Sequence, residues 1–581
     1  MSRLILSTHS GFHDAAAAVF EDYSLKAAVQ LERLTRVKGD GRTHPDLAID
    51  EVLGIVGATR RDVDVVVYSR MALPTRYFSR LGGWRWLRQQ YRSRVKHKTR
   101  IPIMPEMLRH QTAQIDTFFD IKAFQKDSGF RDAAAVFFSN HHLAHALPTL
   151  FYSPWNDAVL VTSDAGGDHV QHSHRYFSNG RIDTLYGGEE NTLAPSLDPS
   201  VLNPSIGAAY AAATHALGFT FNRHEGKVTG LAAMGEPIFA EEIARHFSVD
   251  GAGQINSEVS TFRTMKRIMQ RLAAQTNREN IAASIQKVLE DLTLQSIARI
   301  LADHPSRHLG LAGGVFANVK LNRLLAEQLP LDEIFIFPAM GDEGLAIGGA
   351  LCFLLEADGL ARWLDRRQPL GDIYLGRDYT QSIDQALAAT PNVQRTGEAA
   401  VDGAVSRLAA GKIGAIYTGR MEFGPRALGA RSILANPSRR DTHDLLNTRL
   451  SRSEFMPFAP VVTAEKAGEV FGVTSVNTRA CRYMTMACDV RPAWRKRIPA
   501  VVHVDGSARP QIVERASNPL YYDILNGFER ATGLPVLVNT SFNVHEEPIV
   551  NSPAECIQAL VDRRVDFVVT DRGLYEHDRA E

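Results

Sequence analysis

Two histidines four residues apart give this sequence its clearest candidate for chemistry. Residues 140–146 read NHHLAHA, and in a helix His141 and His145 would lie on one face, close enough to share a metal ion. The flanking sequence is apolar and rich in alanine, which favours that helix. His142 could replace His141 as the partner of His145, and histidines that cap a helix or fill a core would show the same spacing.

Carboxylates that could complete a metal site stand in two glycine-bearing loops. Asp164 lies in the segment SDAGGD and Asp342 in the segment MGDEG. Two imidazoles with two carboxylates suit Fe(II), Mn(II) or Zn(II), and open positions on such a metal could accept phosphate oxygens. Asp168 and Glu343 are alternative donors in the same loops, and carboxylates at helix N-termini also occur without a metal.

The elements that must position these residues alternate between strands and helices. Residues 4–22 and 158–181 share a pattern of apolar strand, polar loop and second strand, which suggests a weak internal duplication. Residues 308–327 and 333–356 each join a short strand through a glycine-bearing loop to an apolar helix. This order predicts an α/β fold, with a nucleotide cleft where the loops present backbone N–H groups.

The composition narrows the function classes. The chain has 581 residues, and its 65 basic and 65 acidic side chains cancel, which gives no global case for binding nucleic acid or a membrane surface. We expect neither a signal peptide nor a membrane anchor, because no apolar run reaches spanning length. The four cysteines are too few and scattered for a disulfide framework or a Cys-based zinc site, which fits the cytoplasm.

A change of character near residue 365 predicts a domain boundary. The chain turns polar and irregular between residues 360 and 396, and apolar strands then alternate with Arg-rich turns. We therefore expect a domain at residues 1–365 that carries the metal and nucleotide sites, and a second α/β domain at residues 366–581.

A set of motifs in this order resembles the O-carbamoyltransferase family, which includes the tobramycin and cephamycin carbamoyltransferases and the nodulation protein NodU. The motifs are HDA at residues 13–15, ERLTRVK at 32–38, NHHLAHA, GGVFANVKLN, GDEG, MEFGPRALGARSILANPSR, SRSEFMPFAPVV, HVDGSARPQ and PVLVNTSFN. The resemblance covers nearly the whole chain. It implies an actin-like, two-lobed first domain, similar to tRNA threonylcarbamoyl transferases, and a YrdC-like α/β second domain.

The resemblance also implies a two-step reaction. Carbamoyl phosphate and ATP, accompanied by Mg²⁺, would give carbamoyl-adenylate in the second domain, with loss of phosphate and pyrophosphate. The first domain would then transfer the carbamoyl group to a hydroxyl of a natural product, a sugar or a macrocycle, and release AMP. The implied metal is iron, and its ligands would be His141, His145, Asp164 and Asp342.

Other residues of the first domain take their roles from the matched motifs. Lys38 would stabilise the developing oxyanion, and His13 would act as the general base for the acceptor hydroxyl. The nucleotide would be contacted by Lys227, Gly313, Gly314 and Asn318, although these could also be turn residues.

The second domain must hold two highly anionic substrates, so we expect several fixed cations there. Planar guanidinium groups bind phosphate oxygens in pairs, and the motifs supply Arg420, Arg426, Arg431, Arg452 and Arg509. Ser541 and Arg509 would contact carbamoyl phosphate, with Asn539 and Asn543 beside them. Glu422 would either align one arginine or cap a turn.

Two further segments have less specific patterns. Residues 70–100 are basic and aromatic, which could serve nucleic acid or a membrane, but we favour a solvated subdomain near the acceptor entrance. Cys481 and Cys488 lie seven residues apart, which predicts one helix face rather than a metal site.

Two other functions are compatible with parts of the sequence. A tRNA threonylcarbamoyl transferase has the same kind of first domain, but it has no use for the C-terminal motifs. A nucleotide-dependent, actin-like binding switch would carry out no transfer. The sequence does not identify the acceptor, and it leaves the oligomeric state open, a homodimer included.

Overall fold

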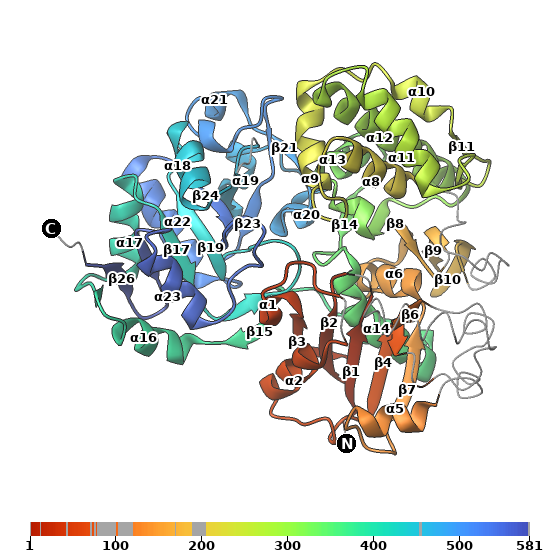
Figure 1. The fold of residues 1–581 in the computed structure, drawn as a ribbon, viewed down its shortest axis with the longest axis horizontal. Helices are drawn as coiled ribbons and strands as arrows, with labels where there is room; N and C mark the ends of the chain where they lie inside the picture. Colours follow the sequence, from red (N-terminus) through yellow and green to blue (C-terminus); the bar gives the residue numbers. More distant parts are fainter. Residues whose placement is uncertain are drawn as a thin grey trace. The chain divides into compact units, whose positions relative to one another are not determined.

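The chain folds into two compact units, each built from sheets and helices, and the expected α/β class is confirmed (Figure 1). Unit 1 comprises Met1–Thr35, Gly39–Ala317 and Phe335–Leu370, and unit 2 comprises Arg36–Lys38, Asn318–Ile334 and Gly371–Glu581. The boundary at residue 365 stays a prediction. The computed structural model describes residues 2–11, 13–41, 44–69, 72–74, 77, 100–102, 120–168, 170–188, 205–452 and 456–578. Most of the basic, aromatic segment 70–100 lies outside the described residues.

Unit 1 contains two five-stranded sheets with the same strand order. The first has the order β3-β2-β1-β4-β7 and the second β10-β9-β8-β13-β14. In each sheet the central strand pairs antiparallel with a hairpin partner on one side and parallel with a strand on the other. This repeat is the arrangement that the duplicated segments suggested. The bounds are β1 Leu4–His9, β2 Ala16–Glu21, β3 Ser24–Gln30, β4 Val65–Ser69, β7 Ala135–Ser139, β8 Asp157–Gly167, β9 Val170–Ser178, β10 Arg181–Tyr186, β13 His308–Ala312 and β14 Glu333–Ile336.

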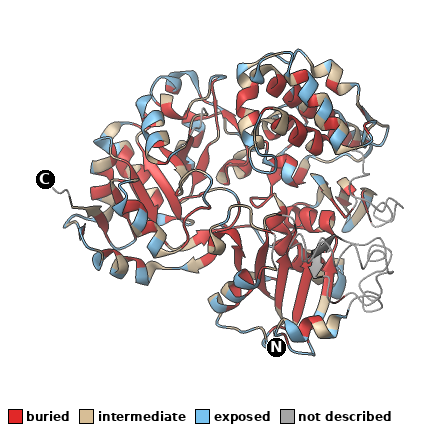
Figure 2. Cartoon of the chain, viewed as in Figure 1, coloured by how far each residue is buried: buried red, intermediate tan, exposed pale blue. Residues whose placement is uncertain are grey.

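Two buried helices pack between the faces of these sheets. α14 (Leu345–Asp358) packs against β1 and β4, α6 (His141–Phe151) packs against β8 and β13, and the two helices pack against each other. Their contact is unusually close at Gly348, where a Cβ atom would lie 1.7 Å from the Ala144 carbonyl oxygen. The strands and both helices are largely buried (Figure 2). This layering brings the start of α6 and the start of α14 to the same part of unit 1.

Most other helices of unit 1 belong to a group in which α11 and α12 pack against α8. Three of these helices begin at polar N-cap side chains, because Ser205, Thr261 and Asn277 each accept a hydrogen bond from a backbone N–H three residues on. The remaining elements are α1 Glu32–Thr35, α2 Asp46–Ile55, β5 Ala72–Pro74, β6 Arg100–Pro102, α5 Ile121–Asp127, α8 Ile206–Ala216, α9 Glu225–Leu231, α10 Ala240–Ala244, β11 Phe247–Val249, β12 Ile255–Ser257, α11 Phe262–Ala273, α12 Arg278–Asp303 and α15 Leu360–Asp365.

Unit 2 is built on one mixed eight-stranded sheet with the order β16-β26-β25-β17-β19-β24-β20-β23. β17 pairs parallel with β25 and antiparallel with β19, so the central strands are fully bonded on both sides. Helices α17 and α22 pack against each other and against this sheet. The strands are β16 Val393–Arg395, β17 Gly414–Tyr417, β19 Arg431–Ala435, β20 Ala459–Thr463, β23 Gln511–Val513, β24 Val536–Ser541, β25 Phe567–Val569 and β26 Leu574–His577.

The remaining elements of unit 2 are helices and short strands. They include α20, which ends before Met484, a residue with a left-handed φ of 58°. The elements are α13 Val319–Gln328, β15 Tyr374–Asp378, α16 Thr380–Ala388, α17 Ala400–Ala409, β18 Arg420–Glu422, α18 Asp441–Arg449, α19 Ala464–Val470, α20 Thr478–Arg482, β21 Cys488–Asp489, α21 Pro492–Arg495, β22 Ser507–Ala508, α22 Pro519–Thr532 and α23 Pro553–Val561.

The predicted helix face through Cys481 and Cys488 is wrong. Cys481 lies in α20 and Cys488 in β21, and the turn at Met484 brings their Sγ atoms to 3.3 Å from each other. Both thiols are buried and free.

None of the helices in the described ranges has the length and apolar character that crossing a bilayer requires.

Candidate functional site

Four side chains of unit 1 converge at the start of α6. The Asn140 side chain caps this helix by accepting a hydrogen bond from the Leu143 N–H, so the helix begins at His141 and places His145 one turn later. Asp164 comes from the end of β8, and Asp342 from the short turn that precedes α14. One ligand atom from each of His141, His145, Asp164 and Asp342 lies within 4.8 Å of all the others.

The distances within this cluster suit a shared cation. His145 Nε2 lies 3.6 Å from Asp164 Oδ2 and 3.5 Å from Asp342 Oδ1, and His141 Nε2 lies 3.8 Å from the same two oxygens. These separations are too long for hydrogen bonds but match donors that surround an ion at about 2.1 Å each. Both Nε2 atoms are buried and lack a hydrogen-bond partner among the described residues. The donor set therefore fits a divalent metal.

The electrostatics keep the carboxylates ionised. Burial alone would lower the pKa of His145, but Asp164 and Asp342 outweigh burial and raise that pKa to about 9. Burial raises the pKa of Asp164, yet His141 and His145 outweigh burial and hold that pKa well below its usual range. A bound metal ion would replace any proton on His145, because a ligating imidazole must be neutral.

Two of the three predicted alternative donors have other partners. His142 Nδ1 lies 2.7 Å from Thr162 Oγ1, and its Nε2 lies 2.9 Å from the Val170 carbonyl oxygen, so His142 is a satisfied core residue. Asp168 accepts a hydrogen bond from the His141 backbone N–H at 2.8 Å and so fixes the start of α6. Glu343 is buried beside the cluster, where burial together with the charge of Asp14 raises its pKa to about 8.

His13, the predicted general base, lies at the edge of this cluster. Its Nδ1 is 2.7 Å from Asp14 Oδ2, and its Nε2 is 4.0 Å from Asp342 Oδ2. Burial lowers the pKa of His13, but the Asp14 hydrogen bond and the charge of Asp342 outweigh burial and raise it to about 10. A metal ion that neutralises Asp342 would remove one of these causes and lower the pKa of His13 toward the range of a general base.

Sequence reasoning missed one histidine here. His9 ends β1, is fully buried, and has its Nε2 3.7 Å from Asp342 Oδ2. Burial lowers the pKa of His9 to about 4. The available signal was weak, because a single histidine at the end of an apolar strand has no characteristic spacing.

The predicted nucleotide-contacting residues fall in both units. Gly313 and Gly314 follow β13, and at Gly313, with a φ of 98°, a Cβ atom would lie 2.3 Å from the Ser163 carbonyl oxygen. The Gly314 N–H points at Asp164 Oδ2 across 3.4 Å. Asn318 belongs to unit 2 and caps α13 by accepting from the Leu321 N–H.

The two predicted lysines also lie in different units. Lys227 is half-buried in α9 of unit 1, and Lys38 is half-buried in the short segment Arg36–Lys38 of unit 2.

In unit 2, three predicted residues meet at the end of β24. Arg452 Nη2 donates to Ser541 Oγ at 3.1 Å, and Ser541 Oγ donates to Asn543 Oδ1 at 2.6 Å. Arg452 Nη1 also donates to Thr540 Oγ1 at 2.7 Å. The cluster places a guanidinium, a hydroxyl and an amide in one network, as a carbamoyl or phosphate group would require.

Arg509 has a different environment from the other arginines. No group within the described ranges makes a hydrogen bond to its guanidinium, which is half-buried. Desolvation, together with repulsion from Arg426, holds the pKa of Arg509 well below its usual range. Two guanidinium groups that repel each other favour the binding of an anion.

Three other predicted residues shape the loop at residues 424–431. Arg431 is fully buried, donates from Nη1 to the Thr418 and Ala430 carbonyl oxygens at 2.7 and 2.9 Å, and lies 3.7 Å from the centre of the Tyr417 ring. Arg420 donates to the Gly376 and Leu375 carbonyl oxygens. The Asn539 amide donates to Gln511 Oε1 and to the Ala427 carbonyl oxygen. These contacts commit donors of Arg420, Arg431 and Asn539 to the protein itself.

Glu422 caps this loop, one of its two expected roles. Its Oε1 accepts hydrogen bonds from the backbone N–H groups of Leu428, Ala430 and Arg431 at 2.7, 3.3 and 3.2 Å. A single carboxylate oxygen thus holds the loop in place.

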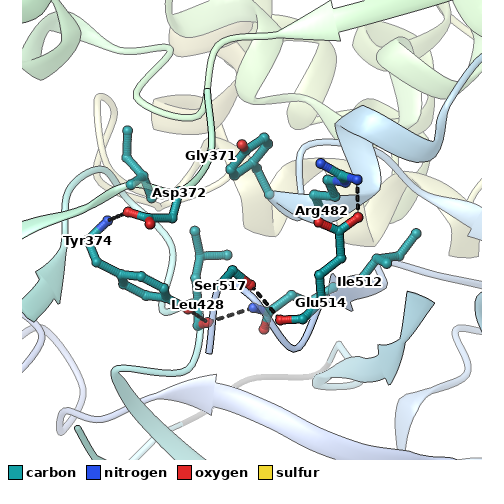
Figure 3. Close-up of a pocket in the computed structure, with 11 residues that line it drawn as sticks. Gly371, Asp372, Tyr374, Leu428, Arg482, Ile512, Glu514 and Ser517 are labelled. Atoms are coloured by element: carbon teal, nitrogen blue, oxygen red, sulfur yellow. Dashed lines mark hydrogen bonds and ion pairs between the residues drawn. The ribbon is translucent and has the colours of Figure 1, made fainter. Parts of the chain in front are cut away.

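A small pocket lies beside this loop in unit 2 (Figure 3). Tyr374 donates its hydroxyl proton to the Leu428 carbonyl oxygen at 2.7 Å, and an ion pair joins Arg482 to Glu514 at the opposite side. The pocket has a volume of about 30 Å³, room for about two water molecules. None of the predicted arginines lines it.

Comparison with known proteins gives the following matches. Residues 4–351 match the family model described as the carbamoyltransferase N-terminus, and residues 405–577 match the carbamoyltransferase C-terminus. An uncharacterized protein of Synechocystis sp. is 31% identical over 98% of this chain and 95% of its own. Nodulation protein NolNO of Sinorhizobium fredii is 30% identical over 98% of this chain and 79% of its own. Among solved structures, component A of the Acidaminococcus fermentans (R)-2-hydroxyglutaryl-CoA dehydratase covers 62% of this chain and 99% of its own, at 12% identity and a TM-score of 0.33, too low to support an argument.

Proposed function

This chain belongs to the carbamoyltransferase family, and from that premise we propose that it is an ATP-dependent O-carbamoyltransferase. In the first step, water releases carbamate and phosphate from carbamoyl phosphate, and a carbamate oxygen attacks the α-phosphorus of ATP, which expels pyrophosphate. In the second step, an acceptor hydroxyl oxygen bonds to the carbamoyl carbon, the bond to AMP breaks, and the hydroxyl proton leaves. The acceptor we propose is a sugar-bearing or macrocyclic natural product.

The observation that carries the proposal is the convergence of His141, His145, Asp164 and Asp342 in unit 1. These residues would hold the metal, for which we propose iron. A divalent cation there supplies positive charge that neutralises the phosphate of the departing AMP. Release of AMP, a phosphate monoester, depends more on the positive charge of this cation than on an additional base.

Proton transfer from the acceptor falls to His13 in this proposal. The Asp14 carboxylate accepts from Nδ1 and so fixes the orientation of the ring, which leaves Nε2 to take the acceptor proton. Glu343, buried beside the same carboxylates, offers a second group that can hold a proton near neutral pH.

The activation step falls to unit 2. Arg509 and Arg426 both supply positive charge. No carboxylate in the described ranges makes a hydrogen bond to Arg509. Arg452 and Ser541 supply a fixed guanidinium and a hydroxyl at the end of β24. We propose that these two groups of residues bind carbamoyl phosphate and the phosphates of ATP, with Mg²⁺ as the companion of ATP.

Isotope exchange separates the two steps. Exchange of labelled pyrophosphate into ATP, dependent on carbamoyl phosphate, reports the first step alone. We expect Arg509→Ala to abolish the exchange, and His13→Ala to keep it while losing carbamoyl transfer to any acceptor. Arg515, an exposed arginine of the same unit, provides the control, and Arg515→Ala should exchange normally. Normal exchange in Arg509→Ala would refute the activation site.

A further inference from the structure

His9 has a buried ring nitrogen that faces the proposed metal cluster. The residue ends β1, at the centre of the first sheet, and its side chain has no exposed surface. Nδ1 lies 2.9 Å from Ser69 Oγ at the end of the adjacent strand β4. Nε2 has no hydrogen-bond partner among the described residues. A buried polar atom without a partner destabilises the fold, so its retention calls for a function.

The Nε2 atom faces one oxygen of a predicted metal ligand. It lies 3.7 Å from Asp342 Oδ2, whereas the other oxygen of that carboxylate, Oδ1, lies 3.5 Å from His145 Nε2. Asp342 therefore stands between His9 and the donor cluster, with one oxygen toward each. His9 is not itself in the group of donors whose atoms lie within 4.8 Å of one another.

The backbone nearby leaves room for this imidazole. At Gly11, two residues after His9, a Cβ atom would lie 2.8 Å from His9 Nε2, closer than side-chain atoms normally approach. The Ser69 hydroxyl can donate to Nδ1, and this arrangement leaves the ring proton on Nε2, directed at Asp342. Glycine at position 11 and serine at position 69 thus both serve the placement of the His9 ring.

We propose that His9 is a positioning residue for the metal site. Its Nε2 lies 3.7 Å from Asp342 Oδ2, and it would close to hydrogen-bonding distance when the four donors hold the metal, and so fix Oδ1 toward the cation. The inference rests on the proposed metal-binding role of the four donors. Carboxylate ligands are generally held by such outer hydrogen bonds, and loss of one typically weakens metal binding by about 10- to 100-fold.

Cobalt(II) binding to the full-length, metal-free protein tests the inference. The affinity is measured by competition with a chromogenic chelator, and the visible cobalt spectrum reports the coordination geometry. We expect His9→Leu to weaken cobalt binding by about 10- to 100-fold and to alter the spectrum. His9→Gln should recover most of the affinity, because its amide nitrogen can donate in place of Nε2.

Two further variants make the result interpretable. His174 is a buried histidine on β9 of the same unit, so His174→Leu controls for the loss of a buried ring and should bind cobalt normally. Ser69→Ala removes the partner of Nδ1 with little change in volume, and we expect it to weaken binding in the same direction. Folding of each variant is checked by thermal unfolding without metal.

Wild-type cobalt affinity in both folded His9→Leu and Ser69→Ala would overturn the positioning role. A loss of affinity in His174→Leu as large as that in His9→Leu would overturn it as well. Absence of cobalt binding by the unaltered protein would instead refute the metal centre of the proposed function, so the two failures are distinguishable.

Discussion

Gly348→Ala should disturb the proposed metal cluster, His141, His145, Asp164 and Asp342, without altering any of its residues. The added Cβ would lie 1.7 Å from the Ala144 carbonyl oxygen, whereas an ordinary contact is 3.4 Å or more, so α14 must move from α6 by well over 1 Å. Neither atom is at the end of a flexible side chain. Overpacking of this kind costs about 1–3 kcal/mol, and we expect the upper end because the clash involves backbone.

The displacement should reach the metal donors directly. Ala144 precedes His145 in α6, and Asp342 immediately precedes α14, so a shift between these helices changes separations that are now 3.5–3.8 Å. Metal sites tolerate errors of about 0.2 Å in each bond. We therefore expect cobalt(II) affinity to fall at least as much as it does in a single outer-contact variant, about 10-fold.

Urea unfolding and cobalt(II) titration of Gly348→Ala provide the measurements. Gly226 in α9 is a matched control, since nothing lies within 4 Å of the position that its Cβ would occupy. Gly226→Ala should be neutral or stabilising by up to about 1 kcal/mol, because alanine favours a helix. A Gly348→Ala protein with unchanged stability and metal affinity would show that the helix contact does not set the geometry of the site.

Two further changes should separate the roles of other residues. Asp164→Asn should reduce the metal affinity more than about 100-fold, because loss of a ligand exceeds the 10- to 100-fold cost of an outer contact, and metal content after dialysis measures it. A variant that retained metal would remove Asp164 from the ligand set. Glu576→Gln should lower the free energy of unfolding by about 1–3 kcal/mol at pH 7, because Arg407 donates hydrogen bonds to both carboxylate oxygens of Glu576. These bonds outweigh burial and lower the pKa of Glu576 to about 2. A carboxylate with a depressed pKa stabilises the fold at pH values above its pKa in the unfolded chain. The difference in unfolding free energy between the variant and the unaltered protein should therefore shrink as the pH falls from about 4.5 toward 2. A difference that does not depend on pH in urea unfolding would contradict the stabilising role of the Glu576 carboxylate.

Local signals were sufficient to place the start of the metal cluster. The Asn140 side chain caps α6, and the spacing of His141 and His145 puts both rings on one face, so three residues within one turn define this part of the site. Asp164 and Asp342 lie elsewhere in the sequence, where their glycine-bearing loops marked them as candidate donors and the motif resemblance implied the same ligand set. The α/β class followed from the alternation of strands and helices, which local periodicity records.

Contacts between distant residues explain what the sequence did not reveal. His9 acquires a role only because β1 and the turn before α14 meet, and a lone histidine carries no pattern that predicts this. The seven-residue spacing of Cys481 and Cys488 suggested one helix face. Instead, Met484 adopts a left-handed conformation and reverses the chain between them. The division into units was also beyond the linear pattern, since Asn318–Ile334 joins unit 2 from within the range assigned to the first domain.

The five motif arginines illustrate the same limit, because identical side chains in similar motifs have opposite environments. Arg431 is fully buried, and its guanidinium donates hydrogen bonds to the Thr418, Ala430 and Gly419 carbonyl oxygens. Arg509 has no hydrogen-bonded partner in the described part of the chain, and it is repelled by Arg426. The first arrangement stabilises the fold. Burial and the charge of Arg426 both disfavour the second, which is consistent with the anion site proposed at Arg509.

This contrast predicts opposite consequences for one substitution. Arg431→Met should lower the free energy of unfolding by about 3 kcal/mol, since the hydrogen bonds of a charged group contribute about 1.5–3 kcal/mol each. Arg509→Met should leave that free energy unchanged or raise it, yet abolish the exchange of pyrophosphate into ATP. Residues that bind charged ligands commonly show such a conflict between stability and activity. If Arg509→Met instead unfolded as readily as Arg431→Met, its guanidinium would be a structural group, and the anion site would have to be sought at Arg452 and Ser541.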